Sequence, residues 1–149
     1  MSTRFSLQNL LDLTQARTET ATRNLGQAFS REQAEDQKLQ MLIEYRRDYQ
    51  ASFQQTMRSG VSPAGWRNYQ EFMNRLDLAV KQQLEVVTHW QRQTLTSRNA
   101  WEIEQRRLKS YDTLHERHHQ AESRRENRAE QKEHDEYSAT AHARLTGAE

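Results

Sequence analysis

The sequence has no cysteine, and its 149 residues include one proline and four glycines. Without cysteine there is no disulfide and no thiolate metal site, which fits a reducing compartment. So few prolines and glycines leave little of the turn chemistry that a fold of many short elements needs. Only 34% of the residues are hydrophobic, too few for a sizeable core, since an average globular domain has roughly 45–50% by a count that includes glycine.

Long apolar runs and blocks of one charge are also missing. The sequence has no run of about 18 apolar residues, so no membrane span is expected. Residues 1–5 lack the apolar core of a secretory signal, and a cytoplasmic protein is therefore expected. The 22 basic and 21 acidic residues are intermixed and give a net charge of +1, so nucleic acid is not an expected partner.

What the sequence does contain is helical periodicity with one interruption, at residues 58–66. Gly60 suits the left-handed position just after a helix C-terminus, where a Cβ would clash. Ser62 is a candidate N-cap, and Pro63 follows at the first helical position, where its missing N–H costs nothing. The stretch therefore predicts that one long helix ends, the chain reverses and a second helix begins.

Both arms carry apolar residues at alternating spacings of three and four, which is typical of a coiled-coil seam. In the first arm Glu32, Glu35 and Arg46 interrupt the seam, whereas the second arm keeps it from Trp66 to Tyr111 and includes all three tryptophans. The expected fold is all-α, a two-helix antiparallel coiled-coil hairpin with an unpaired C-terminal helical extension. We expect one domain at 1–149, with helix 1 at about 4–58, the tip at 59–65, helix 2 at about 63–140, and 119–149 unpaired.

Antiparallel pairing about the tip places Phe53 beside Tyr69, and it exhausts the first arm when the second reaches about residue 118. The remainder, 119–149, is mostly charged. An unpaired polar helix is either a solvated tail or a segment that becomes ordered on a partner. Spacing alone leaves both interpretations open.

A tempting motif is the run His-Glu-Arg-His-His at 115–119, which matches the H-E-x-x-H pattern of zinc peptidases. The strands, cleft and core that such a site needs are not expected in this sequence, so we interpret the match as a coincidence. A zinc enzyme and adventitious zinc or nickel binding remain alternatives. No catalytic residue, cofactor or metal site is expected, and the sequence has no phosphate-binding loop for ATP hydrolysis.

Near the tip, the apolar band is wider than a two-helix seam requires. Three residues of the first arm share one face, and three of the second arm do the same; they are Leu42, Tyr45, Tyr49, Phe72, Leu76 and Ala79. The band is either a broad helix–helix interface with incidental exposure or a docking patch for another protein.

At these residues the sequence resembles the enterobacterial form of the flagellar export protein FliJ family. The likeness covers nearly the whole chain. It includes Gln40-Met41-Leu42-Ile43-Glu44-Tyr45, Tyr49, Gly60, Trp66-x-Asn68-Tyr69-Gln70-x-Phe72, Trp90, Trp101, Glu126-Asn127-Arg128 and Asp135-Glu136. The order of these motifs is specific, whereas any single coiled-coil match would not be. Lys38 and Gln83 depart from the family pattern, which has Gln and His at these positions.

The resemblance implies a soluble component of the flagellar type III protein export apparatus, peripherally associated with the inner membrane through protein contacts. It implies a hairpin similar to the central stalk of rotary ATPases. The implied partners are the hexameric export ATPase, the cytoplasmic domain of the membrane export gate protein, and export chaperones that lack cargo. Alternatives are the stalk protein of a virulence type III secretion system and a purely structural coiled-coil oligomer.

The resemblance also assigns residues to these contacts. The export-gate patch would be the six-residue set given above. Contact with the ATPase ring would fall on Arg117, Glu126, Asn127, Arg128, Gln131, Lys132, Asp135 and Glu136.

Overall fold

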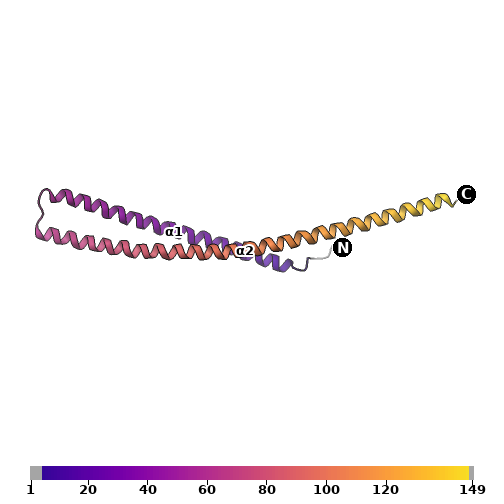
Figure 1. Cartoon of the computed structure of the whole chain (residues 1–149), viewed down its shortest axis with the longest axis horizontal. Coiled ribbons are helices and arrows are strands. Elements are labelled where there is room, and N and C mark those ends of the chain that lie inside the picture. Colours follow the sequence, from indigo (N-terminus) through magenta and orange to yellow (C-terminus); the bar gives the residue numbers. More distant parts are fainter. Residues whose placement is uncertain (1–4, 148–149) are drawn as a thin grey trace. The chain divides into compact units, whose positions relative to one another are not determined.

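The computed structural model describes residues 5–147 and contains two helices (Figure 1). Helix α1 spans Gln8–Met57 and helix α2 spans Pro63–Thr146, with no strand in the described range. The all-α helical hairpin expected from the sequence is confirmed. The expected start of helix 1 near residue 4 and the last two residues of 119–149 lie outside the described residues. Helix α2 continues past residue 140, where its end was expected.

The reversal between α1 and α2 follows the predicted capping chemistry. Gly60 has a φ of 90°, and its N–H donates to the carbonyl oxygen of Met57 at 3.1 Å, just after the last turn of α1. At the start of α2, the hydroxyl oxygen of Ser62 accepts a hydrogen bond from the N–H of Gly65 at 3.1 Å. Ser62 thereby satisfies one of the donors that a helix N-terminus leaves without an intrahelical acceptor.

Contacts divide the chain into two compact units, and the first comprises residues 19–103. In this unit α1 and α2 lie side by side and antiparallel (Figure 1). Its buried residues follow the three-four spacing of a seam; they are Ala21, Ala28, Glu35 and Leu39 of α1, and Met73, Leu76, Val87 and Thr94 of α2. Bulky apolar side chains dominate the seam near the tip, whereas alanine and threonine occupy it farther along the hairpin.

The second unit combines the N-terminal residues to Thr18 with α2 from Glu104 onward. Leu11, Thr14 and Thr18 are buried here, and the Thr18 hydroxyl donates to the carbonyl oxygen of Thr14 at 2.8 Å. That hydrogen bond lets a threonine occupy a buried seam position without an unpaired hydroxyl. Every residue from 123 to 147 is exposed, so this part of α2 is a polar helix surrounded by solvent.

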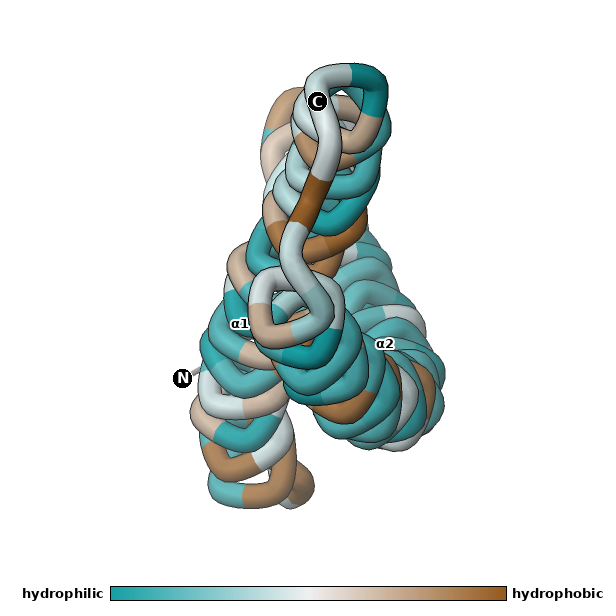
Figure 2. The backbone as a smooth tube through the Cα atoms, turned by 90° about the vertical axis from the view of Figure 1, so that its left-hand side faces the viewer, coloured by the Kyte–Doolittle hydropathy of each residue, from teal (hydrophilic) through white to brown (hydrophobic). Residues whose placement is uncertain are grey.

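Hydrophobic residues occur in short groups of up to three between polar residues along both helices, and the tube alternates accordingly between the two colours (Figure 2). Within residues 5–147, neither helix contains a segment that is both long and apolar enough to span a bilayer.

Candidate functional site

Six aromatic rings form a continuous set of contacts between the helices near the tip, which we call the aromatic ladder. They are Tyr45, Tyr49 and Phe53 of α1, and Trp66, Tyr69 and Phe72 of α2. Phe53 stacks on Tyr69 with ring centroids 3.7 Å apart, and Tyr49 lies 4.5 Å from Phe72. Aromatic pairs contribute about 0.5–1.5 kcal/mol each beyond the area that they bury. The ladder therefore fixes the two helices against each other at this end of the unit.

The predicted docking patch overlaps the ladder. Tyr45 lies 6.2 Å from Phe72 and 6.4 Å from Tyr49, measured between ring centroids, so the structure brings these three rings together. Tyr45 is 53% exposed, whereas Tyr49 and Phe72 are half-buried. The surface of the patch is centred on Tyr45, the most accessible of its rings.

Not every predicted patch residue faces solvent. Leu76 is only 7% exposed, because it packs in the seam between the helices. Leu42 and Ala79 are half-buried. The sequence placed Leu76 on both the seam and the patch, and the structure shows it as a buried seam residue.

A shallow groove of about 420 Å³ adjoins the patch. Its apolar lining comes from Met41, Leu42 and Tyr45 of α1, and its polar lining from Lys38 of α1 and Gln83 of α2. Met41 is 67% exposed. Lys38 and Gln83, the two positions expected from the sequence to differ from the family pattern, both border this groove.

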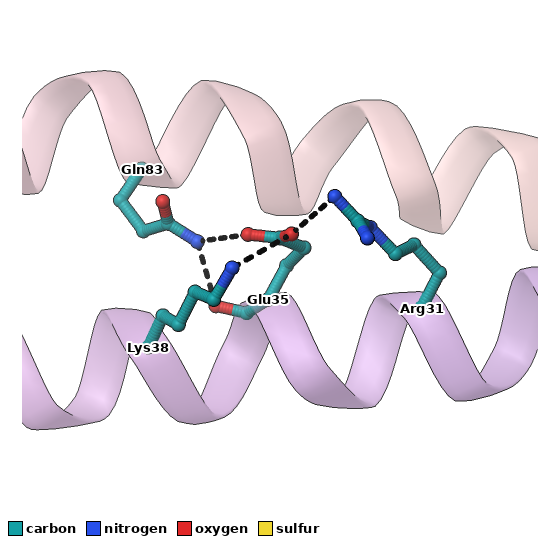
Figure 3. A network of polar contacts seen from close by, with 4 residues as sticks. All are labelled: Arg31, Glu35, Lys38 and Gln83. Carbon is teal, nitrogen blue, oxygen red and sulfur yellow. Dashed lines mark hydrogen bonds and ion pairs between the residues drawn. The ribbon is translucent and has the colours of Figure 1, made fainter.

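Lys38 and Gln83 also belong to a polar network around a buried carboxylate (Figure 3). The Glu35 side chain is 4% exposed, and its Oε1 lies 3.0 Å from the Arg31 guanidinium and 3.4 Å from the Lys38 ammonium. From the facing helix, Nε2 of Gln83 donates to Oε2 of Glu35 at 2.7 Å and to its backbone carbonyl at 2.9 Å. In the sequence, Glu35 is an interruption of the apolar seam. In the structure, its carboxylate is bound by side chains of both helices.

These contacts determine the ionisation of Glu35. The hydrogen bond from Gln83 lowers the pKa of the Glu35 carboxyl, burial opposes the shift, and the hydrogen bond and positive charge of Lys38 and the charge of Arg31 lower it further. Glu35 is therefore ionised at neutral pH. Sequence reasoning missed this network because Gln83 is 48 positions away along the chain.

Arg46, another predicted interruption of the seam, forms an ion pair with Asp77 across the hairpin. The two side chains are 38% and 52% exposed, so the pair contributes at most about 1 kcal/mol. The pair contributes mainly to specificity. Together with the Gln83–Glu35 hydrogen bond, it defines the register of α1 against α2.

The residues predicted to contact an ATPase ring lie on the exposed C-terminal part of α2. Gln131 donates to Asp135 at 3.4 Å, and Lys132 pairs with Glu136 at 3.8 Å, both at the i, i+4 spacing of one helical face. Arg117, Glu126, Asn127 and Arg128 are exposed as well. Five of the eight predicted residues share one mixed-charge face of the helix; they are Arg128, Gln131, Lys132, Asp135 and Glu136.

The H-E-x-x-H motif is part of a packing contact. The His115 ring meets the Phe5 ring edge-on at 5.2 Å, and the Glu116 carboxylate accepts a hydrogen bond from Gln120 at 3.1 Å. Among residues 5–147, no three histidine, aspartate or glutamate side chains gather in a way that could hold a metal ion. A half-buried His115 against a phenylalanine is a seam residue, in keeping with the three-four spacing.

A family model and two curated relatives identify the same family for this chain. The family model described as "Flagellar FliJ protein" matches residues 3–146. The flagellar FliJ protein of Escherichia coli (strain K12) is 32% identical over 136 residues, covering 91% of this chain and 92% of that protein. The flagellar FliJ protein of Salmonella typhi is 31% identical over 136 residues, with the same coverage. This chain therefore belongs to the flagellar FliJ family.

Proposed function

We propose that this protein is a non-enzymatic link between the hexameric export ATPase and the membrane export gate of the flagellar type III export apparatus, and that it binds export chaperones lacking cargo. Membership of the FliJ family makes it a component of that apparatus. The observation that carries the proposal is the family match over residues 3–146. The protein would act in the cytoplasm and reach the inner membrane through protein contacts.

The patch near the tip is the proposed gate-binding surface. Tyrosine side chains often dominate protein–protein affinity, because they bury a large area at little conformational cost. Tyr45 is exposed and its ring is held by Phe72 and Tyr49. A partner would therefore meet a surface that needs little further ordering, which favours affinity.

The exposed helix beyond residue 118 is the proposed ATPase-binding segment. It carries both signs of charge, with Lys132 and Glu136 forming an i, i+4 ion pair, and it has no side chain buried in the range 123–147. A helix of this kind gains its packing from a partner. Complementary charges on a ring would orient the segment and speed its association.

Gate binding tests the proposal at Tyr45. We expect Tyr45→Ala to weaken binding to the cytoplasmic domain of the cognate gate protein about tenfold, as loss of an interface tyrosine does. Isothermal titration calorimetry gives the affinity, and circular dichroism checks that helix content is unchanged. Tyr137→Ala is the matched control, because Tyr137 is 77% exposed and lies outside the patch. Equal affinities of Tyr45→Ala and the wild type would refute the gate assignment.

A further inference from the structure

The Glu35 network ends at the side chains that border the groove. Lys38 and Gln83 both bond to Glu35, and both line the groove beside the patch. The groove and the network therefore share two polar side chains. Resting on the proposed function, in which this region binds the export gate, we infer that Glu35 is a positioning residue for gate binding, although its own side chain is buried.

The orientation of Gln83 depends on Glu35. Its amide nitrogen faces two acceptors, the Glu35 carboxylate at 2.7 Å and the Glu35 carbonyl at 2.9 Å. A flipped amide would set its oxygen against both of these acceptors, which excludes that orientation. Figure 3 accordingly shows the Gln83 oxygen pointing away from Glu35. Glu35 thus determines that Gln83 offers an acceptor, and not a donor, to whatever enters the groove.

Lys38 is held in a similar way. Its ammonium lies 3.4 Å from Oε1 of Glu35 while its side chain remains 60% exposed. A lysine has a flexible four-carbon stem, and ordering such a side chain on binding opposes association. The Glu35 carboxylate restricts the Lys38 side chain before the partner binds, so less conformational entropy is lost on binding. Arg31 contacts the same oxygen at 3.0 Å, and its guanidinium lies 5.6 Å from the centre of the Trp90 ring, so it does not compete for the groove.

If Glu35 only held the two helices together, a packed apolar side chain in its place would leave gate binding unchanged. Replacing a buried ionic network by a well-packed apolar side chain is often neutral or stabilising. Leucine at position 35 would continue the seam between Ala28 and Leu39, both of which are buried. Glu35→Leu should therefore preserve the hairpin. It releases Lys38 from the carboxylate and leaves Gln83 with one of its two acceptors, the backbone carbonyl of residue 35.

The test compares Glu35→Leu with Glu32→Leu. Glu32 is a half-buried seam carboxylate one turn away and does not line the groove, so it is a matched control. We expect both variants to keep or raise the thermal unfolding midpoint. Only Glu35→Leu should raise the Kd for the gate domain, by about fivefold, the effect of one misplaced hydrogen bond. A Glu35→Leu variant that binds as tightly as the wild type overturns the inference.

A second readout does not depend on the gate. In nuclear magnetic resonance spectra, the two side-chain amide protons of Gln83 should differ from those of exposed glutamines. Glu35→Leu, but not Glu32→Leu, should shift the proton that donates to the carboxylate. An unchanged Gln83 amide signal in Glu35→Leu contradicts the positioning role. Failure of the wild-type protein to bind the gate domain would instead refute the proposed function, while this signal would still test the role of Glu35.

Discussion

Phe53 of α1 and Tyr69 of α2 stack face to face, with centroids 3.7 Å apart and ring planes within 4° of each other. Phe53 also lies 6.0 Å from Trp66, and Tyr69 lies 5.8 Å from Tyr49. The pair joins the two helices close to the tip, where the chain has just reversed. It therefore fixes which residues meet across the rest of this unit.

The first prediction concerns this pair. Phe53→Ala should lower the free energy of unfolding by about 2–3 kcal/mol, because it removes a half-buried ring and its stacking partner contacts. Urea unfolding followed by circular dichroism measures the change. Phe29→Ala is the matched control, since Phe29 is 49% exposed and should cost about 0.5 kcal/mol or less. Equal losses in the two variants would show that the ladder does not hold the helices together.

Two glycines should respond to alanine in opposite directions. Gly60→Ala should destabilise the protein by about 1 kcal/mol, because a Cβ at a φ of 90° is strained. Gly26 lies within α1, and a Cβ there meets no atom within 4 Å. Gly26→Ala should therefore stabilise the protein by about 1 kcal/mol. Thermal unfolding of both variants checks the signs, and a gain at Gly60 would mean that the tip does not need its left-handed residue.

The lowered pKa of Glu35 predicts sensitivity to acid. A carboxyl with a depressed folded-state pKa contributes stability that is fully present above its ordinary pKa, about 4.3, and is lost as the pH falls through the folded value. The difference in unfolding free energy between the wild type and Glu35→Gln should thus shrink as the pH drops below that ordinary value. Denaturant unfolding of both proteins across pH 7 to 3 measures it. A difference that stays constant would show that the contacts of Glu35 do not depend on its charge.

The C-terminal segment provides a fourth prediction. Removing 119–149 should leave the unit 19–103 folded, because none of its seam residues lies in the removed part. Binding to the cognate export ATPase should be lost. Circular dichroism follows the fold and analytical ultracentrifugation follows the complex. As a milder variant, Arg128→Glu with Lys132→Glu should weaken the complex without shortening the helix. Unchanged binding by the shortened chain would refute the assignment of this segment.

The sequence predicted the hairpin because both capping chemistry and apolar spacing are local properties. Gly60, Ser62 and Pro63 mark the tip, and counting outward from the tip places Phe53 against Tyr69, as observed. The same reasoning passed over the seam positions Thr14 and Thr18, which are buried although they are polar. A search for apolar residues cannot find them, because threonine can satisfy its hydroxyl within its own helix.

The candidate site was less predictable than the fold. Leu76 belongs by spacing to both the seam and the patch, and only packing decides that it is buried. In the sequence of α1, Glu35 is a charged residue at an apolar seam position. The structure explains it, because Gln83 of α2 donates a hydrogen bond to its carboxylate. Such cross-helix chemistry depends on side-chain geometry that no single-helix pattern contains. The polar surface beyond residue 118 carries no spacing signal at all, since its packing would come from another protein.

The most direct test of the account is ATP hydrolysis by the cognate export ATPase, measured against increasing concentrations of the full-length protein. The linking role predicts saturable stimulation that levels off near one copy per ATPase hexamer. The chain shortened to 1–118 should give no stimulation in the same assay. No stimulation by the full-length protein, with an ATPase that is active and forms rings, would contradict the proposed link.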